Sequence, residues 1–215
     1  LTVYSEVIQD SVLDLIDFGK VGFASGTSLS LSPNRLEQFY KNVDKYKGKI
    51  ILRPQEISNN PEVIRRLGII AINTAVEADI YGNVNSTNTV GSRMINGIGG
   101  SGDFARNSYI SIFTTQSVIK NGDISCIVPM VSHCDHTEHD VDVIITEQGV
   151  ADIRGLSPIE RARKIIENCA HPDYKKGLLE YLEEAINTCP HKHIPHMLDK
   201  SLSWHERLIR TGSMK

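Results

Sequence analysis

The chain has 215 residues, with 23 Lys and Arg against 26 Asp and Glu and a formal net charge of −3. Hydrophobic residues make up 40% of it and charged residues 23%, and no apolar run approaches the roughly 20 residues that cross a bilayer. These figures predict one globular domain, residues 1–215, and exclude membrane spans and disordered tails. Because the balance is slightly acidic and no dense Lys/Arg block is present, we do not expect nucleic acid as a partner. Without a long apolar run, we do not expect a membrane either.

The four cysteines are scattered without a C-x-x-C pair, so the sequence predicts neither a disulfide framework nor a cysteine zinc site. This cysteine usage is typical of a reducing compartment. The chain starts at Leu1 and lacks the charged and apolar regions of a signal peptide. We therefore expect a piece of a longer chain in the cytoplasm, or in the mitochondrion of a eukaryote.

In the first third of the chain, apolar residues at helical spacing from Val7 to Ile16 predict a helix directly after Glu6. Gly19 stands where a left-handed C-terminal cap is expected. Gly26 is the predicted start of a turn. The other elements predicted here are a strand at 20–25, a helix from Ser32-Pro33 to about Tyr46, a strand at 49–52 and a short helix from Asn60-Pro61.

The run at 68–76 is apolar and rich in isoleucine, which predicts a strand inside a buried sheet. Ser157 and Glu160 form a capping box with Pro158 at the first helical position. Further strands are predicted at 109–114, 125–131 and 141–146, and helices at 158–169, 172–186 and 198–209. The alternation predicts an α/β domain with a mixed or parallel sheet and a helical C-terminal tail.

A glycine-rich segment, residues 96–104, formally matches G-x-G-x-x-G at Gly97, Gly99 and Gly102. A dinucleotide fingerprint needs a hydrophobic strand before it, whereas residues 84–96 are mostly polar, so an NAD or FAD site is disfavoured. The glycines either build a turn with positive φ angles or leave the backbone bare so that its N–H groups reach a ligand oxygen. We favour the second interpretation, because Gly99 and Gly100 leave both faces open.

A metal site is one interpretation of three closely spaced histidines, His133, His136 and His139. Their i, i+3, i+6 spacing argues against it, because it places them on different faces of a helix or strand. The alternative is a polar loop between two strands, and we predict no metal site. Glu6 before a helix is ordinarily a favourable charge at its N-terminus. Glu147 ends a strand at a turn, where α/β domains commonly carry functional side chains. The residues alone leave both roles open.

Taken together, ordered segments along nearly the whole chain resemble the C-terminal half of the acetyl-CoA hydrolase/transferase family, most of all its succinyl-CoA:acetate branch, beside the 4-hydroxybutyrate enzymes. The segments that carry the resemblance are Tyr4-Ser5-Glu6-Val7, Phe23-Ala24-Ser25-Gly26, Arg53-Pro54, Ile57-Ser58-Asn59, Ala71-Ile72-Asn73, and residues 77–82, 96–104, 129–133, 136–141 and 146–155.

The resemblance implies a CoA-transferase-like fold of the NagB/RpiA type, with acyl-CoA and a small carboxylate as substrates and no permanently bound cofactor. It implies that Glu6 is the nucleophile and that Gly100 donates its backbone N–H to the acyl oxygen, with Gly99 beside it in contact with coenzyme A. Glu147 would lie beside the nucleophile, and Asn59 would support the site. An N-terminal half would add CoA contacts, and we expect a homodimer.

The implied chemistry is a ping-pong transfer through a glutamyl-CoA thioester at Glu6, because an ionised carboxylate attacks a thioester without a general base. Glu147 near Glu6 would raise one of their two pKa values by like-charge repulsion. The alternative is a hydrolase on the same scaffold, in which water resolves the thioester. A non-catalytic CoA-binding module is the other class. We expect this piece alone to be inactive.

Overall fold

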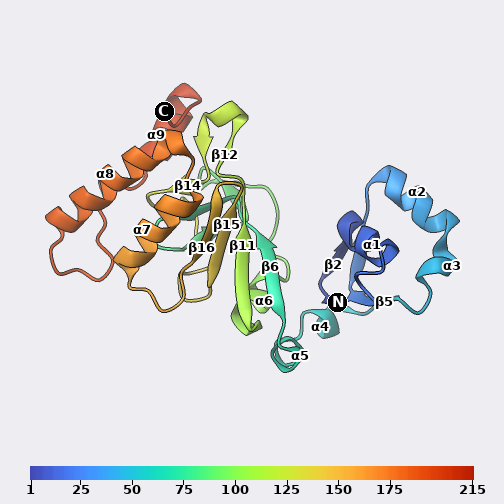
Figure 1. Ribbon diagram of the computed structural model, residues 1–215. Coiled ribbons are helices and arrows are strands. Elements are labelled where there is room, and N and C mark those ends of the chain that lie inside the picture. The colour runs from blue at the N-terminus through green and yellow to red at the C-terminus, as the bar shows by residue number, and fades with distance from the viewer. The chain divides into compact units, whose positions relative to one another are not determined.

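The computed structural model describes all residues, 1–215, and divides them into two compact parts (Figure 1). Residues Leu1–Ile69 form the first unit, and Ile70–Lys215 form the second unit. Each unit has a hydrophobic core of its own. None of the helices is both long and apolar enough to cross a membrane.

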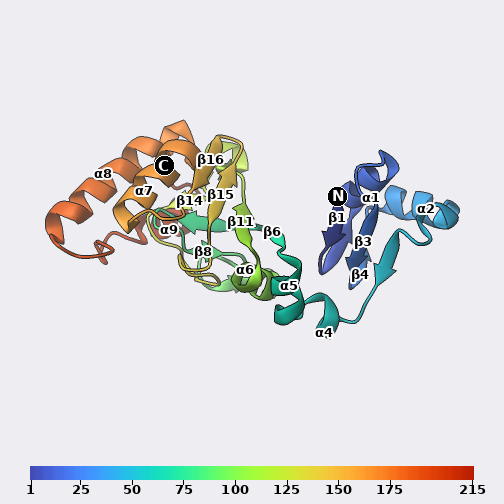
Figure 2. The same cartoon turned by 60° about the horizontal axis from the view of Figure 1, so that its bottom comes forward.

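The first unit contains two small parallel sheets. In one, β3 (Phe23–Gly26) lies between β1 (Thr2–Tyr4) and β5 (Ile50–Leu52). In the other, β2 (Val7–Gln9) pairs with β4 (Ser28–Ser30). Strands β1 and β3 lie side by side, with α1 and α2 next to them (Figure 2). The helices of this unit are α1 (Asp10–Asp17), α2 (Pro33–Lys41), α3 (Val43–Tyr46), α4 (Gln55–Ser58) and α5 (Pro61–Leu67).

The start of the first predicted helix was wrong, because Val7–Gln9 form β2 and α1 begins only at Asp10. Ile8 is fully buried and pairs with Leu29 of β4, so strand pairing outweighs the helical spacing of the apolar residues. The Asp10 carboxylate accepts hydrogen bonds from the backbone N–H and hydroxyl of Ser32. The cap at Gly19 is confirmed by its φ of 69°.

The helix predicted at 33–46 is divided at Asn42 into α2 and α3. Asn42 has φ −122° and ψ 27°, and its side-chain amide donates to the carbonyl oxygen of Gln38 at 2.8 Å. A side chain that bonds to the backbone in this way competes with continuation of the helix.

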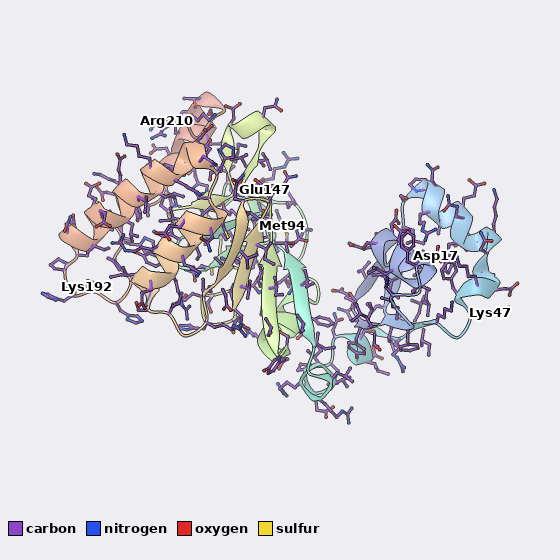
Figure 3. The ribbon with its side chains drawn as sticks, viewed as in Figure 1. Asp17, Lys47, Met94, Glu147, Lys192 and Arg210 are labelled. Atoms are coloured by element: carbon purple, nitrogen blue, oxygen red, sulfur yellow. The ribbon has the colours of Figure 1, made fainter.

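Asp17, labelled in Figure 3, ties α1 to the two helices that follow. Its carboxylate lies 2.8 Å from the guanidinium of Arg35 and 2.8 Å from the ammonium of Lys45, and it accepts a hydrogen bond from the hydroxyl of Tyr46. Burial acts to raise the pKa of Asp17, but these donors outweigh it and lower the pKa to about 2. The network links α1 to α2 and α3.

The second unit is built on a mixed four-stranded sheet in the order β16-β15-β11-β6. Its parallel strands are β6 (Ile70–Thr74), β11 (Ile110–Thr114) and β15 (Val143–Thr146), and β16 (Gly149–Asp152) is antiparallel to β15. Helix α7 (Pro158–Cys169) lies between this sheet and α8 (Pro172–Thr188) (Figure 1). The remaining helices are α6 (Ser101–Asn107) and α9 (Ser203–Thr211). The predicted capping box of α7 is present.

Shorter strands complete the second unit. The three-stranded sheet β14-β7-β8 is formed by β14 (Ile127–Val128), β7 (Glu77–Asp79) and β8 (Val84–Asn85). The other short elements are β9 (Asn88–Thr89), β10 (Arg93–Met94), β12 (Val118–Ile119), a 3₁₀ helix (Lys120–Gly122) and β13 (Ile124–Ser125). The single strand predicted at 125–131 was therefore wrong. Cys126 separates β13 from β14, because its neighbours pair with two different partners, β12 and β7.

Burial of the isoleucines in the strand predicted at 68–76 was wrong, although the strand exists. In β6, Ala71 is buried, whereas Ile70 and Ile72 are 58% and 69% exposed. Strand β6 is the edge of its sheet, and alternate residues of a strand face opposite sides. The α/β class, the mixed sheet flanked by helices and the helical C-terminal part are confirmed.

Candidate functional site

Glu6 lies half-buried in the turn between β1 and β2, directly beyond the carboxyl end of β1. Its carbonyl oxygen accepts a hydrogen bond from the N–H of Thr27 at 2.7 Å. A Cβ atom on Gly26 would lie 3.2 Å from the carbonyl oxygen of Ser5, so glycine allows β3 to approach this turn closely. The carboxyl ends of parallel strands are where α/β sheets ordinarily carry their sites.

Arg53 follows β5 at the same edge of the first sheet. Its backbone N–H donates to the carbonyl oxygen of Gly26 at 2.8 Å, and its Nε donates to the hydroxyl of Ser25 at 3.0 Å. The edge that carries Glu6 therefore also carries a cation, to which sequence reasoning assigned no role. A basic residue directly after a predicted strand was the available signal.

Asn59 follows α4 in the first unit and is 6% exposed. Neither its side-chain oxygen nor its side-chain nitrogen has a hydrogen-bond partner. A buried amide without partners costs free energy, and such groups in folded proteins call for an explanation. The side-chain amide of Asn59 could therefore hydrogen-bond to a bound molecule.

The glycine-rich segment lies before α6 in the second unit. Gly99 has φ 56°, a left-handed conformation that favours glycine, whereas Gly100 is the N-cap of α6 with φ −79°. Gly97 and Gly102 also lie outside the positive-φ region, and an added Cβ on Gly97 would meet no atom within 4 Å. Turn geometry thus accounts for Gly99 alone. Only the two-residue β10 lies just before the segment, so the dinucleotide context is absent.

Glu147 lies at the turn between β15 and β16 (Figure 3), beyond the carboxyl end of β15. Its carboxylate accepts hydrogen bonds from the N–H of Ser117 at 2.8 Å and from the Ser117 hydroxyl, and Gln148 adds a third at 3.1 Å. Burial acts to raise the pKa of Glu147, but these donors outweigh it and lower the pKa to about 2. The raised pKa expected for one of the two glutamates is therefore not found at Glu147.

The histidines of residues 133–139 point to different partners. His133 Nε2 lies 3.3 Å from Asp135, His139 Nε2 lies 3.4 Å from Glu138, and His136 is 1% exposed with its Nε2 3.1 Å from the Ser101 hydroxyl. No group of three potential metal ligands is formed in the chain. The hydrogen bond between His136 of the histidine segment and Ser101 of the glycine-rich segment was not predicted, because neither sequence pattern indicates contact with the other.

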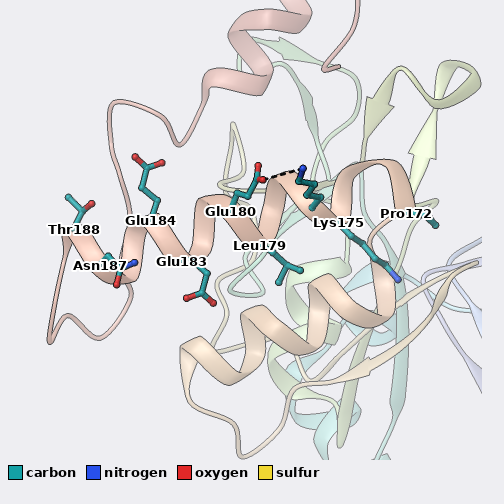
Figure 4. A pocket seen from close by; sticks show the side chains of 9 residues that line it. Pro172, Lys175, Leu179, Glu180, Glu183, Glu184, Asn187 and Thr188 are labelled. Atoms are coloured by element: carbon teal, nitrogen blue, oxygen red, sulfur yellow. Dashed lines mark ion pairs between the residues drawn. The ribbon is translucent and has the colours of Figure 1, made fainter.

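A hollow along α8 is lined only by residues of that helix, among them Lys175, Leu179 and Glu183 (Figure 4). Its lining joins no strand end and none of the predicted site residues. The predicted residues instead form two groups. Glu6 and Asn59 belong to the first unit, whereas Gly99, Gly100 and Glu147 belong to the second.

The acetyl-CoA hydrolase/transferase C-terminal domain matches residues 36–182, a range that includes the boundary between the two units. The chain belongs to this family.

Three curated relatives match at least 99% of the chain. The succinyl-CoA:acetate CoA-transferase of Clostridium kluyveri is 65% identical, the propanoyl-CoA:succinate CoA transferase of Escherichia coli 57%, and the acetyl-CoA hydrolase of Schizosaccharomyces pombe 54%. The chain spans only 40%, 42% and 43% of their respective lengths.

Two solved structures show the same fold. RipA from Yersinia pestis superimposes with a TM-score of 0.74 at 28% identity, covering 86% of this chain and 44% of that one. A 4-hydroxybutyrate CoA-transferase from Porphyromonas gingivalis gives 0.66 at 26% identity, covering 86% and 45%. The predicted CoA-transferase-like fold is confirmed.

Proposed function

We propose that this chain is the nucleophile-bearing part of a CoA-transferase that moves coenzyme A between an acyl-CoA and a small carboxylate. The observation that carries the proposal is the position of Glu6, in a turn at the carboxyl edge of a parallel sheet. The 65% identity to a succinyl-CoA:acetate CoA-transferase supports succinyl-CoA and acetate as the substrate pair. Coenzyme A is then a substrate, and no permanently bound cofactor is required.

In the proposed reaction, a carboxylate oxygen of Glu6 attacks the thioester carbonyl carbon, and the C–S bond breaks to release CoA thiolate. The thiolate then attacks the glutamyl carbonyl of the resulting anhydride, which releases the first carboxylate and leaves a glutamyl-CoA thioester. The second carboxylate attacks this thioester, and the same two steps in reverse yield the new acyl-CoA and free Glu6. Every step exchanges one acyl bond for another, so no oxidant or general base is needed.

Three residues of the second unit and Asn59 of the first unit take supporting roles in this proposal. The backbone N–H of Gly100 would stabilise the negative charge on the acyl oxygen, an interaction of about 3 kcal/mol when preorganised, and Gly99 would let coenzyme A approach. Glu147, fully ionised at neutral pH, would act as a fixed charge. The unpartnered amide of Asn59 would bind the thioester or the glutamyl group.

Further parts of the whole protein belong to the proposal. Because the relatives are more than twice as long as this chain, a preceding N-terminal half would supply CoA contacts and exclude water. We also expect a homodimer in the cytoplasm, or in the mitochondrion of a eukaryote.

Trapping of the intermediate tests the nucleophile. The full-length protein is given acyl-CoA and then borohydride, which reduces a glutamyl-CoA thioester to an alcohol. We expect a mass change on the peptide that contains Glu6 and its loss in Glu6→Gln. Glu56→Gln, which changes an exposed residue of α4, serves as the control and should keep the label. Label on any other residue would contradict the assignment.

A hydrolase is the second candidate, favoured by the 54% identity to an acetyl-CoA hydrolase. The two differ in what resolves the glutamyl-CoA thioester, a carboxylate or water. If CoA release from acyl-CoA is as fast without a carboxylate acceptor as acyl-CoA exchange is with one, the hydrolase assignment replaces the transferase.

A further inference from the structure

Hydrogen bonds join both ends of the glycine-rich segment to two neighbouring loops, one that contains Ser86 and one that contains His136. At its start, the Asn96 side-chain amide donates to the carbonyl oxygen of Ser86 at 3.1 Å and to that of Gly97 at 3.0 Å. At its end, the Ser101 hydroxyl lies 3.1 Å from Nε2 of His136. Residues 97–99 between these two ends are exposed, and no side chain of the glycines themselves can anchor them.

His136 is itself rigidly held. Its backbone exchanges two hydrogen bonds with Val84, of 2.8 and 3.0 Å, and its ring centroid lies 4.8 Å from that of Phe113 in β11. The neighbouring Asp135 carboxylate accepts hydrogen bonds from the N–H of Ser86 at 2.7 Å and from the Thr87 hydroxyl at 2.9 Å. The two loops that bind the ends of the glycine-rich segment are therefore also hydrogen-bonded to each other.

The hydrogen bonds assign the proton on the imidazole. The Ser101 hydroxyl donates its single proton to the carbonyl oxygen of Ile98 at 2.7 Å, so its oxygen accepts from His136. The Ser86 hydroxyl, 3.4 Å from the same Nε2, donates to Asp135. Burial lowers the pKa of His136 against the opposing charges of Asp135 and Asp140, which favours the neutral ring with its proton on Nε2.

We infer that His136 is a positioning residue, which holds the glycine-rich segment in place through the chain of hydrogen bonds from His136 to Ser101 to the carbonyl group of Ile98. The inference rests on the proposed function for its kinetic consequence. An oxyanion donor stabilises a transition state only if its backbone is fixed beforehand, and small displacements of a reacting group are costly. Gly100 directly precedes Ser101, so the hydrogen bond between Ser101 and His136 lies one residue from the proposed donor.

The test separates this role from simple packing of a buried ring. Ser101→Ala removes the hydrogen bond and leaves the ring in place. His136→Asn leaves the amide donor short of the Nε2 position, whereas His136→Gln places an amide N–H near it. His139→Asn is the matched control, because His139 belongs to the same segment and its side chain is 79% exposed.

In the full-length protein, we expect Ser101→Ala and His136→Asn each to lower kcat about 10- to 100-fold with KM changed less than about threefold. His136→Gln should recover most of kcat, and the double variant should be no worse than either single one. Amide hydrogen exchange across residues 97–102 should speed up in the two damaging variants alone. His139→Asn should match the unsubstituted protein in all these measurements.

Unchanged kcat and exchange in Ser101→Ala would overturn the inference, as would equal loss in His136→Gln and His136→Asn. If His136→Asn fails to fold, Ser101→Ala decides by itself. Absence of both CoA transfer and label at Glu6 in the unsubstituted protein would refute the proposed function instead. In that case the exchange rates still decide whether His136 and Ser101 hold the segment.

Discussion

Glu147 is the residue whose protonation the structure defines most directly, because its carboxylate accepts hydrogen bonds from the N–H and hydroxyl of Ser117 and from the side-chain amide of Gln148. The pKa near 2 keeps Glu147 ionised at neutral pH. Its negative charge contributes to the electrostatic field at the carboxyl end of β15.

Ser117→Ala should raise the pKa of Glu147, because it removes the hydroxyl donor while the backbone N–H remains. Carboxyl carbon chemical shifts followed over pH measure this change. A carboxyl group with a lowered folded pKa stabilises the fold above its ordinary pKa of 4.5, and this contribution is lost as the pH falls through about 2. The stability difference between wild type and variant should therefore shrink across that range.

Ser157→Ala is the control for this titration. It removes the hydroxyl that bonds to Glu160 at the start of α7, and it should leave the pKa of Glu147 unchanged. An identical titration of Glu147 in wild type and Ser117→Ala would show that other groups keep the carboxyl ionised.

At the scale of elements, α9 is fastened to the centre of the second unit by a buried pair. His205 Nε2 lies 2.8 Å from the carboxylate of Glu77 in β7, and both side chains are less than a tenth exposed. The other carboxylate oxygen of Glu77 accepts from the Asn85 amide and from the N–H and hydroxyl of Ser132. Burial acts to raise the pKa of Glu77, but the hydrogen bond and charge of His205 outweigh it and lower the pKa.

Glu77→Ala should lower the free energy of unfolding by about 3–5 kcal/mol, because it leaves His205, Asn85 and Ser132 without their common partner. Urea unfolding at pH 7 measures it. Since the folded pKa of Glu77 is below 4.5, the contribution is present above that pH and is lost as the pH falls through the folded pKa. The difference between variant and wild type should therefore shrink in acid.

Glu184→Ala is the matched control, because Glu184 pairs with Lys200 at the surface, where both side chains are nearly half exposed. Its loss should cost about 0–1 kcal/mol. Equal destabilisation by the two substitutions would mean that the buried pair does not anchor α9.

The differences between predicted and observed elements share a physical cause. Helix α7 was predictable, because its capping box and first-turn proline are local signals. The strand at Val7–Gln9 depends on pairing with β4, whose residues lie 21 positions later in register, and this pairing overrides a helical spacing of apolar residues. The exposed Ile72 follows from the place of β6 at a sheet edge, and strand order cannot be read from one strand's composition.

The site residues were predicted through the family resemblance rather than from their local patterns. Glu6 and Glu147 look ordinary in sequence, and they are candidates because each follows the carboxyl end of a strand that pairs with distant segments. Ser117 and His136 were missed for the same reason, since their partners lie 30 and 35 residues away. Hydrogen bonds over such separations leave no periodic signal in the sequence.

At the scale of the whole molecule, the chain carries two groups of candidate site residues but spans only about two fifths of its relatives. A carboxylate nucleophile is weak, so the proposed reaction would depend on binding energy from the distant parts of coenzyme A and on exclusion of water. None of the candidate site residues is assigned to the nucleotide arm of coenzyme A. The remaining length of the full protein is where the proposed function locates the residues that bind this arm.

Residues 1–215 produced alone should fold, because each unit has a hydrophobic core of its own, yet should transfer CoA several orders of magnitude more slowly than the full-length protein. Correct positioning of reactants supplies about 7–11 kcal/mol of the barrier reduction, and a substrate without its binding partner forfeits most of it. Thermal unfolding and a side-by-side transferase assay measure the two halves of this prediction. Adding the proposed N-terminal half, produced separately, should restore part of the rate, because it would supply the CoA contacts in trans. If residues 1–215 alone turn over as fast as the full-length protein, these residues form the complete site, and the two units by themselves bind the CoA arm.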